Sequence, residues 1–401
     1  MKKLLANVRV IDFSWIGAGS YTTKILADLG ADVIKIESSQ RLDTLRVTKP
    51  FKDGKPGANR SGYFADRNSS KRSVTLNLKT AQGLALAKRL IADAQLVTNN
   101  FTPGVMEKLG LGYETLKAVA PHLVFASMSM QGATGPEKND LGYGLTIAAL
   151  TGLQHMTGLP DRQPAGTGTN YPDHIPNPGH GAFAILAALR HQRRTGQGQF
   201  IDLAQMESTL AMTGPSLMNF LVNGVIDGRH GNARPGHAPS GVYPCSGTDR
   251  WIAMEISDNA QWRALVRVLR LPDRAEWHDR ETRLRQRDAI DAAIAAVTPS
   301  HDMARLAAAL QEAGVPAGSV YDARDVMRDP QLEQRGHWVT LNHPEMGPST
   351  YNSAPYRFSD AQSAPTSPAP LLGQHTGEVC RELLGLDEAG IAALRADGVL
   401  S

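Results

Sequence analysis

The chain has 401 residues, of which 41% are apolar and 20% are charged, as is typical of soluble globular proteins. This length favours two domains over one and is sufficient to bury a large core. A formal net charge of only +3 argues against a nucleic-acid-binding surface, although it is compatible with local basic patches that meet an acidic ligand.

The two cysteines, Cys245 and Cys380, are far apart and have no CxxC spacing, which argues against a disulfide framework and against a structural zinc site. The first residues, MKKLLANVRVIDF, lack the apolar run of a signal peptide. No window approaches the ~20 apolar residues of a membrane span. We therefore expect a cytoplasmic protein that binds neither membrane nor nucleic acid.

Strand and helix signals alternate in the N-terminal part of the chain. The expected order is a strand at 8–13, a glycine-rich break at 17–21, a helix at 22–30, strands at 31–37 and 73–78, a helix at 80–94, a strand at 96–101, helices within 103–121 and a strand at 123–130. Such alternation is typical of a doubly wound α/β domain on a parallel sheet.

The regular alternation of strand and helix signals ends in the second half of the chain. A helix is expected to begin near Gly179, and a turn, a strand and another helix follow within 194–212. After Asn223 comes a Gly/Pro-rich connection, then a strand at 251–257 and a charged helical run over 259–313. We therefore predict a smaller second domain at 225–325.

Gly17-Ala-Gly19 resembles the start of a dinucleotide-binding fingerprint, and Glu37 ends the second strand 37 − 17 = 20 positions later. However, Thr22 occupies the third glycine position, where a small residue normally lets helix and strand pack closely. The residues 14–16 also lengthen the turn. An NAD-dependent oxidoreductase therefore stays an alternative, beside the interpretation that the glycines only turn the chain.

Basic side chains gather around the strand expected at 73–78, namely Arg67, Lys71, Arg72 and Lys79. Asn100 and Phe101 follow the next strand, and Lys108 comes one helical turn beyond Gly104. Ligands of open α/β sheets bind at the carboxyl ends of the strands. These residues would suit a pyrophosphate or a 3′-phosphate, with Phe101 or Leu76 against an adenine, whereas the alternative is an ordinary solvated basic face.

The stretch YPDHIPNPGHG (171–181) holds one acid, Asp173, among turn-forming residues just before the helical run 182–194. An ordinary turn would explain this composition. The alternative is a carboxylate that is held rigidly for chemistry. We expect His174 and His180 to frame the pocket of such a carboxylate without carrying protons.

Several stretches together resemble the family III CoA-transferases, also called the CaiB/BaiF type. They are VRVIDFSWIGAGSYTTKILADLGADVIKIE (8–37), NSSKRSVTLNLKTAQG (68–83), NNFTPGVMEKLGLGYETL (99–116), ILAALRHQRRTGQGQFIDLAQMES (185–208), AGVPAGSVYDARDVMRDPQL (313–332) and APLLGQHTGEVCRELLG (369–385). Their order and spacing make the resemblance specific, and it covers nearly the whole chain.

The resemblance implies a doubly wound, parallel-sheet large domain built from both chain ends, 1–224 and 326–401, with the smaller α+β domain 225–325 inserted between them. It also implies an interlocked homodimer. The family's catalytic aspartate falls on Asp173. The family positions that contact coenzyme A fall on Gly17, Ala18, Leu76, Asn77, Leu78, Lys79, Asn100, Phe101, Lys108 and Tyr143.

This chain departs from the family pattern at three places, one of which is the distance from Asp173 to the following helix, about one residue longer than is usual in the family. Ser38 follows the strand-ending acid where a basic residue is common, so a contact to the adenosine phosphate is either lost or made by Arg41. The segment HGNARPGHAPSG (230–241) lacks the glycine run that closes over the site in some transferases.

The chemistry implied by the resemblance moves CoA from an acyl-CoA to a free carboxylic acid through an acyl-aspartyl anhydride and an aspartyl-CoA thioester, without a metal. The nearest alternative is the α-methylacyl-CoA racemase type, which needs a second proton-transfer group. Where racemases carry a His-Asp pair, this chain has Tyr143-Gly144, and a tyrosine with a pKa near ~10 is a poor base. A non-catalytic CoA-binding protein is a third possibility.

Overall fold

A computed structural model describes residues 2–401, which fall into two compact units. The larger unit runs to Gln154 and also contains Gly166–Ile226 and Glu333–Ser401. The smaller unit comprises His155–Ala165 and Asp227–Leu332. The short segment His155–Ala165 groups with the smaller unit, although no feature of its sequence separates it from the large domain.

A six-stranded parallel sheet forms the centre of the larger unit. Its strands are β1 (Arg9–Asp12), β2 (Asp32–Glu37), β3 (Arg72–Thr75), β4 (Leu96–Asn99), β5 (Val124–Ser127) and β6 (Phe200–Asp202). The strand order is β3-β2-β1-β4-β5-β6, and every neighbouring pair is parallel. The order reverses between β1 and β4, which is the switch point where open α/β sheets bind ligands.

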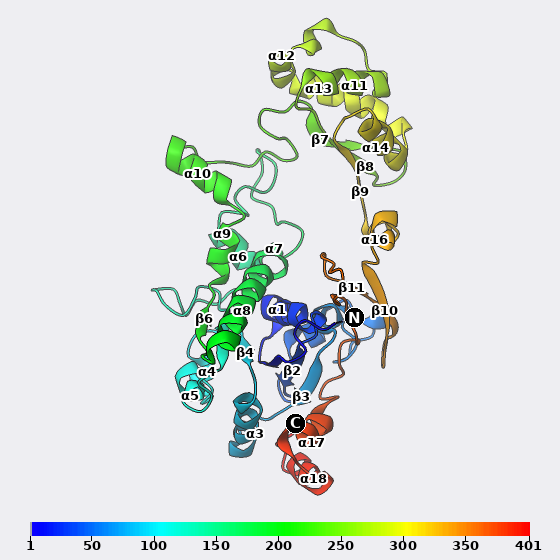
Figure 1. The fold of residues 1–401 in the computed structure, drawn as a ribbon. Helices are drawn as coiled ribbons and strands as arrows, with labels where there is room; N and C mark the ends of the chain where they lie inside the picture. The colour runs from blue at the N-terminus through cyan, green and yellow to red at the C-terminus, as the bar shows by residue number, and fades with distance from the viewer. Residues whose placement is uncertain (1) are drawn as a thin grey trace. The chain divides into compact units, whose positions relative to one another are not determined.

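Helices cover both faces of this sheet because both faces of its strands are apolar. On one face, Val10 and Val124 belong to an apolar cluster with α1 (Ile16–Asp28) and α8 (Pro176–Thr195). On the other, Ile11 and Phe125 pack with α3 (Ala81–Ala92), α17 (Thr376–Leu384) and α18 (Glu388–Ala396). Of the two C-terminal helices, drawn in red in Figure 1, α17 packs against β3. The predicted mixed α/β fold with a parallel sheet is confirmed.

Shorter elements complete the larger unit. They are α2 (Gly62–Asn68), α4 (Val105–Lys108), α5 (Tyr113–Lys117), α6 (Gly144–Leu150), α7 (Tyr171–His174), α9 (Gln205–Leu210), α10 (Gly214–Asn223) and the antiparallel hairpin of β10 (Trp338–His343) and β11 (Gly347–Asn352). None of the helices in residues 2–401 combines the length and the apolar character that crossing a membrane requires.

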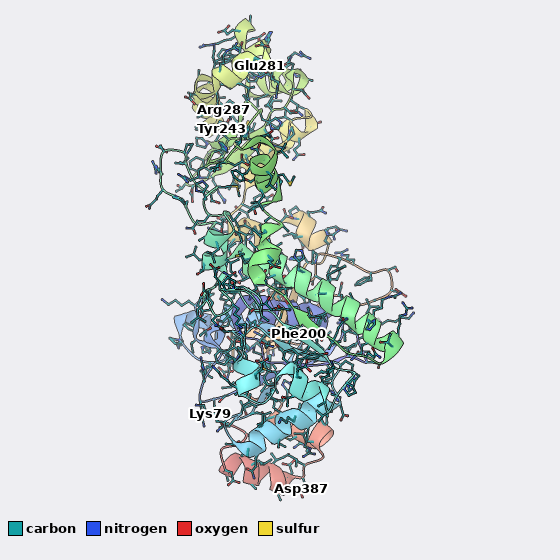
Figure 2. The ribbon with its side chains drawn as sticks, turned by 90° about the vertical axis from the view of Figure 1, so that its left-hand side faces the viewer. Lys79, Phe200, Tyr243, Glu281, Arg287 and Asp387 are labelled. Atoms are coloured by element: carbon teal, nitrogen blue, oxygen red, sulfur yellow. The ribbon has the colours of Figure 1, made fainter. Side chains whose placement is uncertain are left out.

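The smaller unit has its own antiparallel sheet and its own core. The sheet consists of β7 (Ser240–Pro244), β8 (Trp251–Glu255) and β9 (Ala317–Val320), and the main helices are α11 (Asn259–Leu269), α12 (Arg280–Arg285), α13 (Arg287–Val297), α14 (Met303–Glu312) and α15 (Ala323–Met327). The helix α16 (Pro330–Gln334) spans the boundary between the units. Tyr243 donates a hydrogen bond to Asp291 at 2.6 Å and lies beside Arg287 (Figure 2).

Two predicted helix starts were wrong, and both errors fall next to the site. The glycines at 17 and 19 do not form a loop: α1 begins at Ile16 and includes them in its first turn. Helix α8 begins at Pro176, ahead of the expected start near Gly179. Proline is favoured in the first turn of a helix because its missing N–H has no partner there anyway, so the prolines that suggested a loop begin the helix.

Candidate active site

A cavity of about 520 Å³ lies in the larger unit at the carboxyl ends of β1 to β5. It brings together most of the predicted site residues, namely Gly17, Ala18, Leu76, Asn77, Leu78, Lys79, Asn100, Phe101, Tyr143 and Asp173. Lys108 is not among the lining residues, although its neighbour Leu109 is. The sequence did not predict that Trp15, Lys138 and Gln205 would line the cavity as well.

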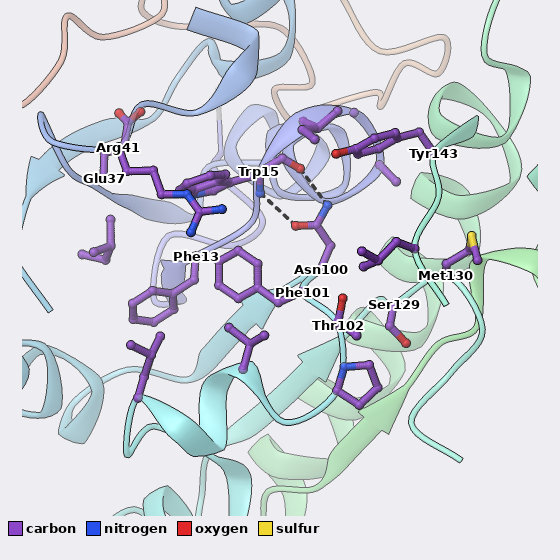
Figure 3. A pocket seen from close by; sticks show the side chains of 18 of the residues that line it. Phe13, Trp15, Glu37, Arg41, Asn100, Phe101, Thr102, Ser129, Met130 and Tyr143 are labelled. Atoms are coloured by element: carbon purple, nitrogen blue, oxygen red, sulfur yellow. Dashed lines mark hydrogen bonds between the residues drawn. The ribbon is translucent and has the colours of Figure 1, made fainter. Parts of the chain in front are cut away.

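An aromatic wall stands at the switch point of the sheet, where the segments after β1 and β4 meet (Figure 3). The Asn100 side chain bridges them: its Oδ1 accepts from the Trp15 N–H at 2.8 Å, and its Nδ2 donates to the Trp15 carbonyl at 2.7 Å. Trp15 meets the Phe101 ring edge-on at 6.0 Å, and the Arg41 guanidinium lies 5.0 Å from the Trp15 ring centre. Flat rings and a cation suit a phosphorylated aromatic base.

Asp173, on the single turn α7, reaches the same cavity between two glycines and is only 5% exposed. A Cβ atom at Gly17 would lie 2.8 Å from the Asp173 Cβ, and one at Gly144 would lie 2.9 Å from its Oδ2. Any side chain at either position would displace the carboxyl group. The first turns of α1 and α6 therefore contribute bare backbone to the surroundings of Asp173.

Burial raises the pKa of Asp173 to about 6, and the Gly144 N–H bond and the charge of Arg67 lower it only in part. Within residues 2–401, no cation forms an ion pair with this carboxylate at 4 Å or less. Asp173 is thus largely ionised at neutral pH while it is poorly solvated, a combination that suits a nucleophile.

Buried hydrogen bonds fix the start of α8 just beyond Asp173. Asn177 is fully buried; its Nδ2 donates to Gln205 at 3.0 Å, and its Oδ1 accepts from the Ser208 hydroxyl. Gln205, which also lines the cavity, donates to the Met128 carbonyl at 2.6 Å. The sequence could not reveal these contacts, because their partners lie on α9 and after β5.

The two histidines do not behave as expected. Neither His174 nor His180 lines the cavity, so the prediction that they frame it was wrong. Nδ1 of His174 lies 2.9 Å from Nη2 of Arg67, and Nδ1 of His180, which is exposed, lies 2.8 Å from the Pro176 carbonyl. His174 lies on α7 and His180 on α8, and both rings bond to groups outside the cavity that Asp173 enters.

Most of the predicted basic cluster also lies outside the cavity. Lys71 is buried and bonds to Asp12, and Arg72 pairs with Asp32, Glu378 and Glu382. Both residues lie at the amino end of β3, opposite the edge where the sheet binds ligands, whereas Lys79 follows its carboxyl end. The clustering of these charges in the sequence was therefore misleading.

Glu37, the acid of the dinucleotide alternative, is already engaged. Arg46 donates to both of its carboxylate oxygens at 2.7 Å, and Ser73 donates at 2.6 Å. A ribose would have to compete with a buried, bidentate ion pair. Thr22, at the third glycine position, packs against Gly181 of α8. These contacts argue against an NAD site.

Residues 5–376 match the family described as CoA-transferase family III. The chain belongs to the family III CoA-transferases. It is an enzyme that transfers CoA between carboxylic acids, and CoA thioesters are its substrates. Among residues 2–401, no group of three or more His, Cys, Asp or Glu side chains is arranged to hold a metal ion.

Several relatives resemble this family III CoA-transferase over their whole length. It is 31% identical to the succinyl-CoA–D-citramalate CoA-transferase of Chloroflexus aurantiacus, over 99% of this chain and 98% of that one. It is 32% identical to the succinate–glutarate CoA-transferase of Agrobacterium fabrum, over 95% and 96%. The crystal structure of a CaiB/BaiF family protein from Brucella suis superposes with a TM-score of 0.87 at 32% identity, over 96% of this chain and all of that one.

Proposed function

We propose that this CoA-transferase moves CoA from an acyl-CoA thioester to a free carboxylic acid through covalent intermediates on Asp173. The observation that carries the proposal is a buried carboxylate, without an ion-pair partner among residues 2–401, at one side of a cavity of about 520 Å³. The same cavity has the aromatic wall of Trp15 and Phe101 at the switch point and a lysine, Lys79, beyond the edge strand β3.

In this proposal the cavity binds acyl-CoA by its two ends. Lys79, Lys138 and Arg41 supply positive charge for the phosphates, and the Trp15–Phe101 wall supplies apolar faces for the adenine. Arg41 would take the role of the basic residue that Ser38 replaces, since both residues line the cavity. The thioester would then reach Asp173 by way of Ala18 and Tyr143.

Asp173 would begin the reaction by attacking the thioester carbonyl. A C–O bond forms, the C–S bond breaks, and the products are an acyl-aspartyl anhydride and CoA thiolate. The thiolate attacks the aspartyl carbonyl, which releases the donor acid and leaves an aspartyl-CoA thioester. The acceptor carboxylate attacks this thioester and forms a second anhydride while it expels the thiolate. Finally, the thiolate attacks the acceptor's acyl carbon, which yields the new acyl-CoA and free Asp173.

Each of these steps is an exchange between charged oxygen and sulfur, so no proton has to be carried. The site must instead donate hydrogen bonds to tetrahedral oxyanions and exclude water, which would hydrolyse the anhydrides. The Gly144 N–H already donates to Asp173, and burial of the carboxylate excludes most water.

We further propose small dicarboxylic acids as the acids that exchange CoA. The support is that relatives at 31% and 32% identity are named for succinyl-CoA or succinate together with citramalate or glutarate. A panel of acyl-CoA donors and carboxylic acids, with products identified by mass spectrometry, tests this proposal. Exchange confined to long-chain or aromatic monocarboxylic acids would contradict it.

The racemase alternative finds less support in the cavity. No histidine lines it within residues 2–401, and Tyr143 offers a phenol where racemases carry a His-Asp pair. Incubating a chiral 2-methylacyl-CoA with the enzyme in deuterated water, without an acceptor acid, separates the two activities. We expect no deuterium at the α-carbon, whereas a racemase would incorporate it.

We also propose that the protein is a homodimer. Helix α10 has no buried residue, and Leu221 and Val222 are 72% and 71% exposed. An apolar helix of ten residues that buries none of its side chains in the described part of the chain is typical of a subunit contact. Light scattering should give a dimer mass, and Leu221→Asp with Val222→Asp should shift it towards the monomer; a monomeric wild-type protein would contradict the proposal.

Asp173→Ala tests the central proposal. We expect CoA exchange to fall at least ~10³-fold, because the covalent route is lost, while CoA binding and melting temperature stay close to the wild type. Gly179→Ala, on the next helix where a Cβ atom would meet open space, is the matched control and should exchange CoA normally. Full exchange by Asp173→Ala would end the proposal.

A further inference from the structure

A cluster of buried and half-buried polar and aromatic side chains connects α2 to the turn that carries Asp173. At its centre is Arg67, in the last turn of α2 and outside the residues that line the cavity. Its guanidinium carbon lies 4.3 Å from the Tyr21 ring centre, and Nη1 pairs with Asp66 at 2.8 Å. Nη2 lies 2.9 Å from Nδ1 of His174, the residue that follows Asp173.

This contact determines which nitrogen of His174 carries the proton. A guanidinium has only donors, so Nδ1 must accept and must be unprotonated. The imidazole is therefore neutral, with its proton on Nε2. In agreement, burial together with the positive charge of Arg67 lowers the pKa of His174 to about 4.

We propose that Arg67 is a positioning residue for the reaction: it fixes His174 as the neutral Nε2–H tautomer and thereby holds α7, with Asp173, towards the cavity. The inference rests on the proposed role of Asp173 as the nucleophile. Arg67 does not touch the carboxylate through a hydrogen bond or ion pair in the structure, so it acts through His174.

The single turn α7 packs against α1, α6, α8 and α9, and the bond from His174 to Arg67 adds a side-chain restraint to α2. Its backbone bonds run from Asp173 N to the Asn170 carbonyl and from Ile175 N to the Tyr171 carbonyl, both at 3.0 Å, and no side chain caps its start. The Arg67–His174 bond ties the turn to a different helix, and Tyr63 of α2 packs edge-on against the imidazole at 6.1 Å. A shift of about 1 Å in a nucleophile costs ~10²-fold in rate.

Arg67 also acts on Asp173 electrostatically. Burial raises the pKa of Asp173, whereas the Gly144 hydrogen bond and the Arg67 charge lower it. The other titratable groups on the elements packed against α7 are Tyr21, Lys24 and Asp28 on α1, Tyr63 and Asp66 on α2, His180, Arg190, His191, Arg193 and Arg194 on α8, and Glu207 on α9. Lys24 and Asp28 pair with each other, and Asp66 pairs with Arg67. Removing Arg67 therefore leaves Asp173 more difficult to ionise.

The test compares Arg67→Met with Arg67→Lys, which keeps the charge and a donor. We expect Arg67→Met to lower kcat by about 10- to 100-fold with KM for acyl-CoA nearly unchanged, and to lose more activity at pH 6 than at pH 8. Arg67→Lys should recover most of kcat and the wild-type pH profile. Arg72→Met removes another partly buried, ion-paired arginine that does not line the cavity and should leave the pH profile unchanged.

A loss that is equal at all pH values and is not rescued by lysine would show a merely structural role and overturn the inference. So would a wild-type kcat in Arg67→Met. If Asp173→Ala keeps full exchange, the proposed function itself fails, and this result is independent of the Arg67 variants.

A second measurement does not depend on catalysis. In the full-length protein labelled with ¹⁵N-histidine, His174, assigned by the loss of its signals in His174→Gln, should show the neutral Nε2–H tautomer from pH 5 to pH 8. Arg67→Met should lose this uniform tautomer. A His174 ring that titrates near ~6.5, or that carries its proton on Nδ1, would contradict the inference.

Discussion

Asp12 and Asp173 are both buried acids of the larger unit, but the protein treats them in opposite ways. Asp12, at the end of β1, is 0% exposed and has a partner for each oxygen: Oδ1 accepts from Ser14 N at 2.9 Å and Oδ2 from the Thr23 hydroxyl at 2.7 Å. Lys71 adds an ion pair at 3.3 Å. Asp173 is almost as deeply buried, yet it has one backbone donor and no such cation.

The pKa values of the two carboxyl groups differ accordingly. Burial raises the pKa of Asp12, but the charges of Lys71 and Lys35 and the bonds from Thr23 and Ser14 outweigh it, so the pKa ends below its ordinary value. Burial of Asp173 is compensated only in part, by the Gly144 hydrogen bond and the charge of Arg67, and its pKa rises to about 6. An acid that is fully paired serves the fold, whereas a buried acid left nearly unpaired, beside a cavity, is available for chemistry.

Removing the lysine that pairs with the ionised Asp12 should give the largest loss in the free energy of unfolding. Lys71→Met leaves a buried carboxylate without its cation, and we expect the free energy of unfolding to fall by about 3–5 kcal/mol. Lys79→Met is the matched control: Lys79 is exposed at the cavity, so this variant should bind CoA less tightly and unfold like the wild type. If Lys71→Met and Lys79→Met unfold at the same urea concentration, the ion pair of Lys71 does not stabilise the buried Asp12, and the contrast between Asp12 and Asp173 fails.

Crowding Asp173 should give a smaller loss, confined to activity. Gly17→Ala places a Cβ atom 2.8 Å from the Asp173 Cβ, so the carboxyl group must move, and we expect kcat to fall about 10²-fold. The melting temperature should change little, because Gly17 lies in a helical turn where alanine is favoured. A wild-type kcat in Gly17→Ala would mean that the position of this carboxylate does not limit the reaction.

The pKa shifts of Asp173 and Asp12 have opposite signs, so the two acids should affect the pH dependence of stability in opposite ways. Because the pKa of Asp173 is raised on folding, its contribution to stability is present below its unfolded pKa, 3.8, and is lost as the pH rises through about 6. Asp173→Asn should therefore be more stable than the wild type at pH 8, and the difference should grow by about 1–2 kcal/mol between pH 5 and pH 8.

Asp12→Asn should behave in the reverse manner. The pKa of Asp12 is lowered on folding, so its contribution is present above 3.8 and is lost as the pH falls through its folded value. This variant should be less stable than the wild type throughout the neutral range. Chemical denaturation of both variants over the pH range measures the two signs, and a destabilised Asp173→Asn at pH 8 would contradict the account.

The sequence predicted the parallel sheet because its strands are short apolar runs separated by helical periodicity, as in VRVIDF (8–13) and ADVIKIE (31–37). Most of the residues that the sequence assigned to the site line the cavity, and Leu76, Lys79, Asn100 and Phe101 could be found because they follow the carboxyl ends of strands. It failed where the prolines and glycines begin helices, at Gly17 and Pro176, because local propensity cannot show that the neighbouring carboxylate demands bare backbone.

Contacts between distant segments were beyond the reach of the sequence. Lys71 and Arg72 looked available to a phosphate, and only the parallel register puts them at the opposite end of β3 from the cavity. Likewise Arg67 and His174 are 107 positions apart, and no local pattern pairs them. The position of Asp173 was predicted from the family resemblance, whereas its burial depends on Gly17 and Gly144 packing around it.

The most direct test of the central claim is to trap the proposed intermediate. The enzyme is incubated with acyl-CoA and then with hydroxylamine, digested, and the peptide that spans 171–181 is sequenced by mass spectrometry. We expect a hydroxamate on Asp173 whose formation depends on acyl-CoA. Asp12, which is buried but fully paired, serves as the control in the same digest and should carry no hydroxamate. An unmodified Asp173 in enzyme that is exchanging CoA, or a hydroxamate on another acid, would contradict the account.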